Sequence, residues 1–163
     1  TAARTEVAVV AIAVSLIDAK GFNSAGFGTF HPGGKLGANF LHVSEIMRKG
    51  QEIPVIKQDK KMSEVLLEMT SKHLGCVGVV DENQNLVGII TDGDLRRHIS
   101  DNLLEQSAAQ VMTKNPVTIK KEMLAIEAIG VLNKKAITSL FVLEDKKIVG
   151  VLHIHDCLRA GIA

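Results

Sequence analysis

The hydrophobic pattern of the chain occurs twice. The apolar run at 87–90 leads into the polar phrase TDGDLRR, and the apolar run at 149–152 leads into HIHDCLR. Each run closes a segment that opens with a short apolar phrase ending in methionine, at 43–47 and at 108–112. Internal repetition at a fixed order of elements is typical of like folding units. The pattern therefore predicts two units of the same architecture.

Within each repeat the pattern predicts the same order of helices and strands. A Pro-Val pair is followed by an amphipathic stretch with helical spacing, by two β-type runs joined by a polar turn, and by a helix bearing Leu and Arg. The pairs of corresponding ranges are 54–55 and 116–117, 62–73 and 123–135, 76–80 and 139–143, 81–85 and 144–147, and the stretches that begin at Asp94 and Asp156. The fold class is therefore α+β, with each unit β-α-β-β-α. A period of about sixty residues exceeds that of most solenoid repeats and favours two small domains packed face to face.

The first forty residues belong to neither repeat. The apolar run at 7–17 is too short to span a bilayer and predicts a core helix. A glycine-rich stretch at 23–40 then predicts a loop. Because the chain opens without an initiator methionine, we interpret it as a fragment that begins inside a helix of a larger domain. The expected boundaries are 1–40, 41–104 and 105–163.

Composition excludes some classes of function. The formal net charge is +1, and the chain has no Trp or Tyr, so neither charge nor base stacking favours nucleic acid. No segment predicts a membrane partner. Cys76 and Cys157 lie in apolar contexts without metal-ligand spacing and are expected to be buried thiols. A reducing cytoplasm is the setting we expect.

One loop phrase has chemical interest of its own. His31 is followed by Pro32 and two glycines, so the backbone there could approach a ligand closely while presenting an imidazole. The plainer interpretation is a linker turn in which His31 packs or caps. The residues alone leave both interpretations open.

The repeated phrases resemble known families. GIITDGDLRR at 88–97 resembles the end of one unit of a tandem CBS-domain pair, a module that binds adenosyl nucleotides or other ligands in a cleft between its units. AKGF at 19–22, FHPGGKLG at 30–37 and GVLHIHDCLRAGIA at 150–163 are similar to the sugar-phosphate isomerase family that includes D-arabinose 5-phosphate isomerase. The resemblance covers essentially the whole chain. It implies the last helix of a truncated SIS isomerase domain, a linker loop and a CBS pair.

The resemblance gives His31 a role. In that family the histidine of the HPGG phrase belongs to the isomerase active site, which interconverts ribulose 5-phosphate and arabinose 5-phosphate for synthesis of the sugar Kdo in lipopolysaccharide. An imidazole that titrates near neutrality can move a proton between adjacent carbons or help to open the sugar ring. His31 is thus the expected catalytic residue of the intact parent. The fragment alone is expected to be inactive, because the family places its other catalytic groups earlier.

The resemblance also implies a ligand site between the repeats. The first copy matches the family's G-apolar-apolar-T-x-x-D pattern at Gly88, Thr91 and Asp94, whereas His153 stands at the threonine position of the second copy. The expected ligand residues are Thr91, Asp94, Arg97, Thr138, Ser139, His153, His155 and Asp156. Carboxylates suit ribose hydroxyls, and imidazole and guanidinium groups suit phosphate or carboxylate. A nucleotide or nucleotide-sugar is the expected ligand, with CMP-Kdo favoured.

Three alternatives remain open. Asp94 and Asp156 could simply cap the helices that follow them. The pair could be a structural module without a ligand, or it could regulate an isomerase for another sugar phosphate. We expect no cofactor and no metal ion, although His153 and His155 would share one face of a predicted strand. Apolar positions on the last helix of each repeat suggest a homodimer of pairs, in a parent that is a homotetramer: Leu95, Ile99, Leu158 and Ile162.

Overall fold

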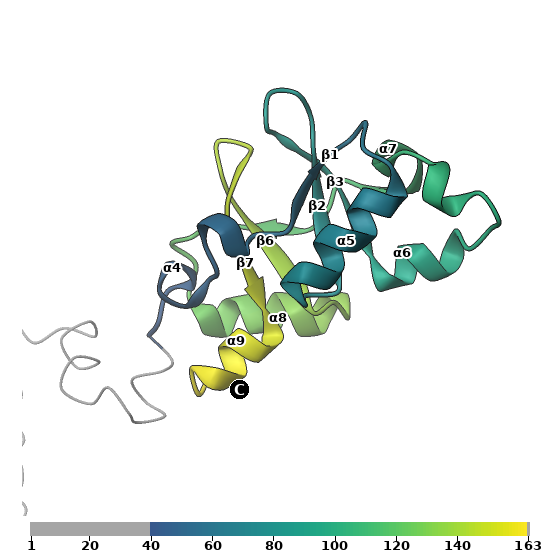
Figure 1. Cartoon of the computed structure of the whole chain (residues 1–163). Coiled ribbons are helices and arrows are strands. Elements are labelled where there is room, and N and C mark those ends of the chain that lie inside the picture. The colour runs from purple at the N-terminus through teal and green to yellow at the C-terminus, as the bar shows by residue number, and fades with distance from the viewer. Residues whose placement is uncertain (1–39, 163) are drawn as a thin grey trace, which may run out of the picture. The chain divides into compact units, whose positions relative to one another are not determined.

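The computed structural model describes residues 40–162 (Figure 1). The helix expected at 7–17 and the His31 loop lie outside these residues. Residues 41–163 form one compact unit by their internal contacts. No helix within the described part of the chain is long and apolar enough to cross a membrane.

The first repeat forms a four-stranded sheet with the strand order β1-β2-β3-β4. Strand β1 runs parallel to β2, β2 and β3 form an antiparallel hairpin, and β3 pairs with the short β4. Its elements are β1 (Val55–Lys57), α5 (Met62–Lys72), β2 (Cys76–Val80), β3 (Leu86–Thr91), α6 (Asp92–Arg97), η2 (Leu103–Glu105) and β4 (Thr113–Lys114).

The second repeat forms a three-stranded sheet with the order β5-β6-β7. Strand β5 is parallel to β6, and β6 and β7 form the hairpin. Its elements are β5 (Thr118–Ile119), α8 (Ala125–Lys135), β6 (Ser139–Glu144), β7 (Lys147–His153) and α9 (Ile154–Arg159). Both repeats thus have the order β-α-β-β-α, which confirms the predicted α+β fold class.

The boundaries follow from local chemistry. Helix α5 buries Met62, Val65 and Met69, which lie three and four residues apart on one face, and it ends at His73 in the left-handed conformation. The predicted turn at 81–85 is present, and Asp81 Oδ1 accepts the Asn85 N–H at 2.8 Å. The prediction was wrong by two residues at the start of α8, because the Glu127 carboxylate accepts the Leu124 N–H and caps the helix there.

The opening phrases of the two repeats are exchanged. Helix α4 (Val43–Ile46) packs against α8 and β7 of the second repeat, and the Val43 N–H donates to Met123 O at 2.9 Å. Helix α7 (Ala108–Val111) packs against β3 of the first repeat, and the Ala108 N–H donates to Lys60 O at 2.7 Å. Each repeat therefore packs against the opening helix that precedes the other repeat in the sequence.

A shared apolar cluster joins the two sheets. Leu74 and Cys76 of the first repeat pack with Phe141 and Val151 of the second, and all four are buried. At Gly78 an added Cβ would lie 3.0 Å from the Phe141 ring, so the sheets touch closely there. Burying a phenylalanine of this kind contributes roughly 1.5–3 kcal/mol. The face-to-face arrangement expected from the sequence is thus held by a common core.

The apolar positions expected at a dimer surface differ in exposure. Ile99 is 73% exposed and Leu158 is 50% exposed. Ile162 is buried, and Leu95 packs against the core of the first repeat. The inclusion of Ile162 and Leu95 in an exposed face was therefore wrong, because these side chains turn toward their own unit.

Candidate functional site

A cleft of about 740 Å³ lies between the two repeats. This volume is in the range of small-molecule sites, which are roughly 300–1,000 Å³. The cleft brings together seven of the eight expected ligand residues: Thr91, Asp94, Arg97, Thr138, Ser139, His153 and His155. Its lining does not include Asp156.

Asp94 lies at one end of the cleft and is almost fully buried, with 2% exposure. One of its oxygens accepts the N–H and the hydroxyl of Thr91, at 2.8 and 2.7 Å. The other accepts Arg97 Nη2 at 2.5 Å and the Thr113 hydroxyl at 2.6 Å. All the usual acceptor positions of this carboxylate are occupied.

These contacts control the charge of Asp94. Burial by itself raises the pKa of the Asp94 carboxyl, but hydrogen bonds from Thr113, Thr91 and Arg97 together outweigh burial and hold the pKa below its ordinary value. Asp94 is therefore ionised at neutral pH. The Arg97 side chain is 64% exposed, so it is the partner that can leave at the smallest cost.

Thr91 and Asp94 also form the start of α6. Thr91 is the residue before the helix and Asp94 is its third residue, and each side chain bonds the backbone of the other. Asp94 therefore takes part in capping α6, and the expectation that Asp94 opens the helix was wrong. The helix begins at Asp92 because the Thr91 hydroxyl accepts the Asp94 N–H.

Ser139, one of the residues that line the cleft, has an unsatisfied buried polar group. Its hydroxyl is buried and has no hydrogen-bond partner among residues 40–162, apart from a weak contact with the Cys76 thiol. Burial raises the pKa of that thiol, so Cys76 is protonated and a poor partner. A buried hydroxyl without a partner costs about 1–3 kcal/mol. A ligand atom in the cleft could remove this cost.

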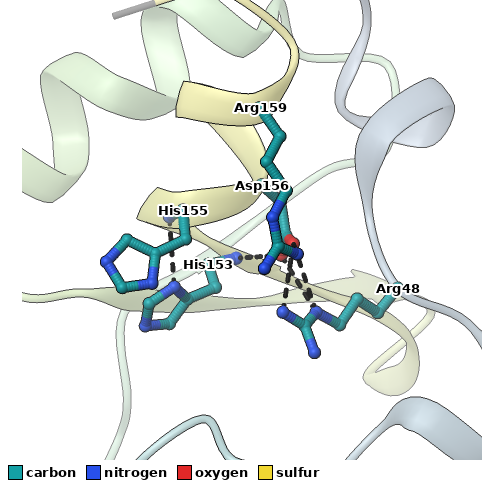
Figure 2. A network of polar contacts seen from close by, with 5 residues as sticks. All are labelled: Arg48, His153, His155, Asp156 and Arg159. Carbon is teal, nitrogen blue, oxygen red and sulfur yellow. Dashed lines mark hydrogen bonds and ion pairs between the residues drawn. The ribbon is translucent and has the colours of Figure 1, made fainter.

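His153 and His155 lie together at the end of β7 (Figure 2). The two ring centroids are 4.6 Å apart and the rings meet at 63°. The expectation that both rings project from one face of a strand was wrong, because β7 ends at His153 and His155 lies in the first turn of α9. Among residues 40–162, no third carboxylate, thiol or imidazole joins them in a group that could hold a metal ion.

The protonation of His153 follows from its contacts. The His155 N–H donates to His153 Nδ1 at 3.1 Å, so Nδ1 is an acceptor and the proton of the neutral ring is on Nε2. Burial, followed by the proximity of His155, lowers the pKa of His153 below its ordinary value. His153 is therefore a neutral donor at pH 7.

Asp156 does not line the cleft and instead forms ion pairs and a helix cap. Figure 2 shows its carboxylate between Arg48 and Arg159. Arg48 Nε lies 3.1 Å from Oδ2 and Arg48 Nη2 lies 3.1 Å from Oδ1, a two-pronged contact, and Asp156 Oδ2 accepts the His153 N–H at 3.2 Å. Arg159 lies farther away, at 3.7 Å. Asp156 thus caps α9, as Asp94 does on α6, but its arginine partner, Arg48, comes from a distant segment of the chain.

Sequence analysis missed two residues of this network. Thr113 and Arg48 each follow the methionine that closes an opening phrase, and each contacts the aspartate of the repeat on which its segment packs. Aligning Met47-Arg48 with Met112-Thr113 could have identified them as a corresponding pair. Their contacts with Asp94 and Asp156 could not be foreseen, because they depend on the exchange of segments.

Comparison with known proteins gives consistent results. The model of the CBS domain family matches residues 43–101 and 108–163. The chain is 41% identical to arabinose 5-phosphate isomerase KdsD of Escherichia coli strain K12 over 155 residues, which cover 93% of this chain and 47% of that protein. The chain thus spans about half the length of the curated relatives it matches.

Solved structures share the fold. The structure of CBSX2 in complex with AMP has a TM-score of 0.66 at 25% identity and covers 74% of this chain and 96% of that one. The CBS-domain pair of MJ0100, in complex with 5-methylthioadenosine and S-adenosyl-L-methionine, has a TM-score of 0.66 at 22% identity over 74% of this chain and 94% of that one.

Proposed function

Because this chain belongs to the CBS domain family, we propose that its two repeats form the ligand-binding regulatory module of an arabinose 5-phosphate isomerase. The proposed boundaries are residues 1–40 for the end of the isomerase domain and its linker, and 41–104 and 105–163 for the two CBS domains. The identity to KdsD along 93% of the chain supports the assignment of the parent enzyme. The parent would act in the cytoplasm and supply the Kdo pathway of lipopolysaccharide.

Catalysis belongs to the parent and not to this module. His31 would act there as an acid or base, or would help to open the sugar ring. Burial raises the pKa of the Cys76 thiol, which lines the cleft, above its ordinary value, and that of the Cys157 thiol to about 11, so neither thiol is an activated nucleophile. The cleft is thus equipped for binding.

The single observation that carries the binding proposal is the buried Ser139 hydroxyl without a good partner in the cleft. A purely structural interface, the second candidate function, would place an apolar side chain there, because an unpaired buried hydroxyl is costly. A bound ligand that bonds to Ser139 would offset that cost. Polar groups from both repeats converge on the same cleft, which is typical of ligand sites.

The contacts suggest how a nucleotide would bind. Arg97 can leave Asp94 and turn its guanidinium toward an anion, which frees one acceptor position on Asp94 Oδ1 for a ribose hydroxyl. From the second repeat, His153 can donate its Nε2 proton into the same cleft, and His155 lies beside it. CMP-Kdo carries a ribose, a phosphate and a carboxylate, so it would use both sets of donors. AMP would leave the carboxylate donors unused.

Calorimetric melting of the 163-residue chain tests this proposal. CMP-Kdo should raise the melting temperature more than AMP or ATP at equal concentration, since binding at 100 times Kd adds about 2.7 kcal/mol to the free energy of unfolding. Ser139→Ala and His153→Ala should reduce the shift. Ser71→Ala is the matched control, because Ser71 lies on α5 and bonds Glu68 O away from the cleft. If no cytidine or adenine nucleotide binds at millimolar concentration, the structural alternative replaces the proposal.

A further inference from the structure

The two repeats offer two related ligand positions, one at each capping aspartate. Gly88 and Gly150 correspond in the repeats, and each is covered by the methionine of an opening phrase, Met112 or Met47. The next residue then pairs with the next strand position: Thr113 with Ile89, and Arg48 with Val151. Thr113 at Asp94 and Arg48 at Asp156 therefore occupy equivalent places.

The residues at these two equivalent positions contact their aspartates differently. Thr113 gives Asp94 one hydrogen bond and leaves an adjoining cleft, whereas Arg48 covers Asp156 with two prongs of a guanidinium. The Arg48 side chain is 22% exposed and that of Asp156 is 11% exposed. The Arg48 contact uses acceptor positions that a ribose would need. Asp94 also contacts an arginine, Arg97, but that side chain is 64% exposed and can leave at a smaller cost.

The chain after each of these residues also differs. Thr113 is followed by Lys114 and Asn115 before Pro116, whereas Arg48 is followed by five residues before Pro54. The additional residues form η1 (Gly50–Glu52). They are tied down by Lys72 Nζ, which donates to Gln51 O at 2.5 Å.

The additional residues place an apolar side chain, that of Ile53, beside the shared apolar cluster. Ile53, which follows η1, packs against the cluster of Leu74, Cys76, Phe141 and Val151. Leu74 and Cys76 are the repeat counterparts of Ile137 and Ser139, and all four residues line the cleft. Ile53 therefore occupies one side of the apolar surface at the second position, while Leu74 and Cys76 also border the cleft.

From these contacts we infer that residues 48–53 act as an internal occupant of the second ligand position. Arg48 takes the place of a ligand at the Asp156 carboxylate, and Ile53 packs against the apolar cluster of Leu74 and Cys76. The module then binds one ligand per chain, at the Asp94 position. This inference rests on the proposed function for its ligand, and it makes Asp156 a structural residue instead of a ligand residue.

Isothermal titration of the 163-residue chain with CMP-Kdo and with AMP tests the stoichiometry, which should be one ligand per chain. Asp94→Asn should weaken binding by about 10- to 100-fold, the effect of losing a hydrogen bond to a charged group. The matched variant Asp156→Asn should leave the Kd unchanged, since Asn can still accept the His153 N–H. Two ligands per chain, or equal losses in the two variants, would overturn the inference.

A melting cycle tests the occupant without any ligand. Arg48→Thr installs the residue found at the equivalent place, and it and Asp156→Asn should each lower the melting temperature. The double variant should lower it no further than the larger single change, because both break the same contact. Additive changes would overturn the inference. If no probe binds while the changes are non-additive, the proposed function fails and the filling of the Asp156 position stands.

Discussion

Replacing Gly88 by alanine should destabilise the protein through one methionine. A Cβ built on Gly88 lies 2.4 Å from Met112 Sδ, 2.8 Å from its Cγ and 3.0 Å from its Cβ. Carbon atoms normally approach to about 3.5–4.0 Å, so Met112 would have to move by about 1 Å. Rotation of the side chain cannot relieve the contact with Met112 Cβ. The end of α7 would therefore have to shift.

The expected cost is that of overpacking a core, about 1–3 kcal/mol. At about 4 °C per kcal/mol for a domain of this size, the melting temperature should fall by about 4–12 °C. The shift should also move Thr113, the next residue, away from Asp94, which it contacts at 2.6 Å. Nucleotide binding should therefore weaken together with stability.

Circular dichroism at 222 nm is the suitable assay, because the chain has no Trp or Tyr for fluorescence. Gly130→Ala is the control, since Gly130 lies inside α8 and an added Cβ there meets nothing within 4 Å. That change should stabilise the helix by about 0.5–1 kcal/mol. Gly150→Ala should repeat the Gly88 effect against Met47, whose Sδ would lie 2.4 Å away. A Gly88→Ala variant as stable as the wild type would refute this reasoning.

Three further outcomes are expected. In the intact parent, His31→Ala should lower turnover by about 10²- to 10⁴-fold without unfolding it, and the 163-residue chain should show no isomerase activity; near-normal turnover would reduce the HPGG phrase to a linker. Light scattering at micromolar concentration should give the mass of at least a dimer, with the exposed Ile99 and Leu158 at the contact. A monomeric mass for the wild type, unchanged in Leu158→Glu, would contradict this. Burial holds the pKa of His153 in the folded state below its ordinary value of 6.5, so protonation of His153 opposes folding. The stability that neutral His153 contributes is complete above pH 6.5 and is lost as the pH falls toward the folded-state pKa. The melting temperature should therefore fall more between pH 7.5 and 5.5 in the wild type than in His153→Asn, and equal falls would exclude His153 as the cause.

The fold could be predicted largely because its signals are local. The β-type run at 76–80 became β2 without change, and the amphipathic stretch at 62–73 became α5 with His73 as its left-handed end. The turn at 81–85 carries its own side-chain bond, from Asn85 to Asp81. Periodicity and turn chemistry act over a few residues, so one sequence suffices to locate these elements.

The site was predicted in part, because its polar residues lie in repeated phrases but its bonds link distant segments. Thr91, Asp94 and His153 were identified from their motif, and they line one cleft. The pairing of Arg48 with Asp156 spans 108 positions of the chain and depends on which repeat receives the opening phrase. The position of His155 was misjudged because a two-residue alternation cannot show that β7 ends at His153.

The exchange of opening phrases makes the two repeats one cooperative folding unit. A chain cut between positions 104 and 105 would give one half without β4 and α7 and another half without α4 and Arg48. Each half would lose a pairing at its sheet edge and one partner of its capping aspartate, Thr113 at Asp94 or Arg48 at Asp156. The halves should therefore be unfolded separately and regain structure only when mixed. A change that destabilises the second repeat must therefore also destabilise the packing of the opening phrase at 43–47, which precedes the first repeat in the chain.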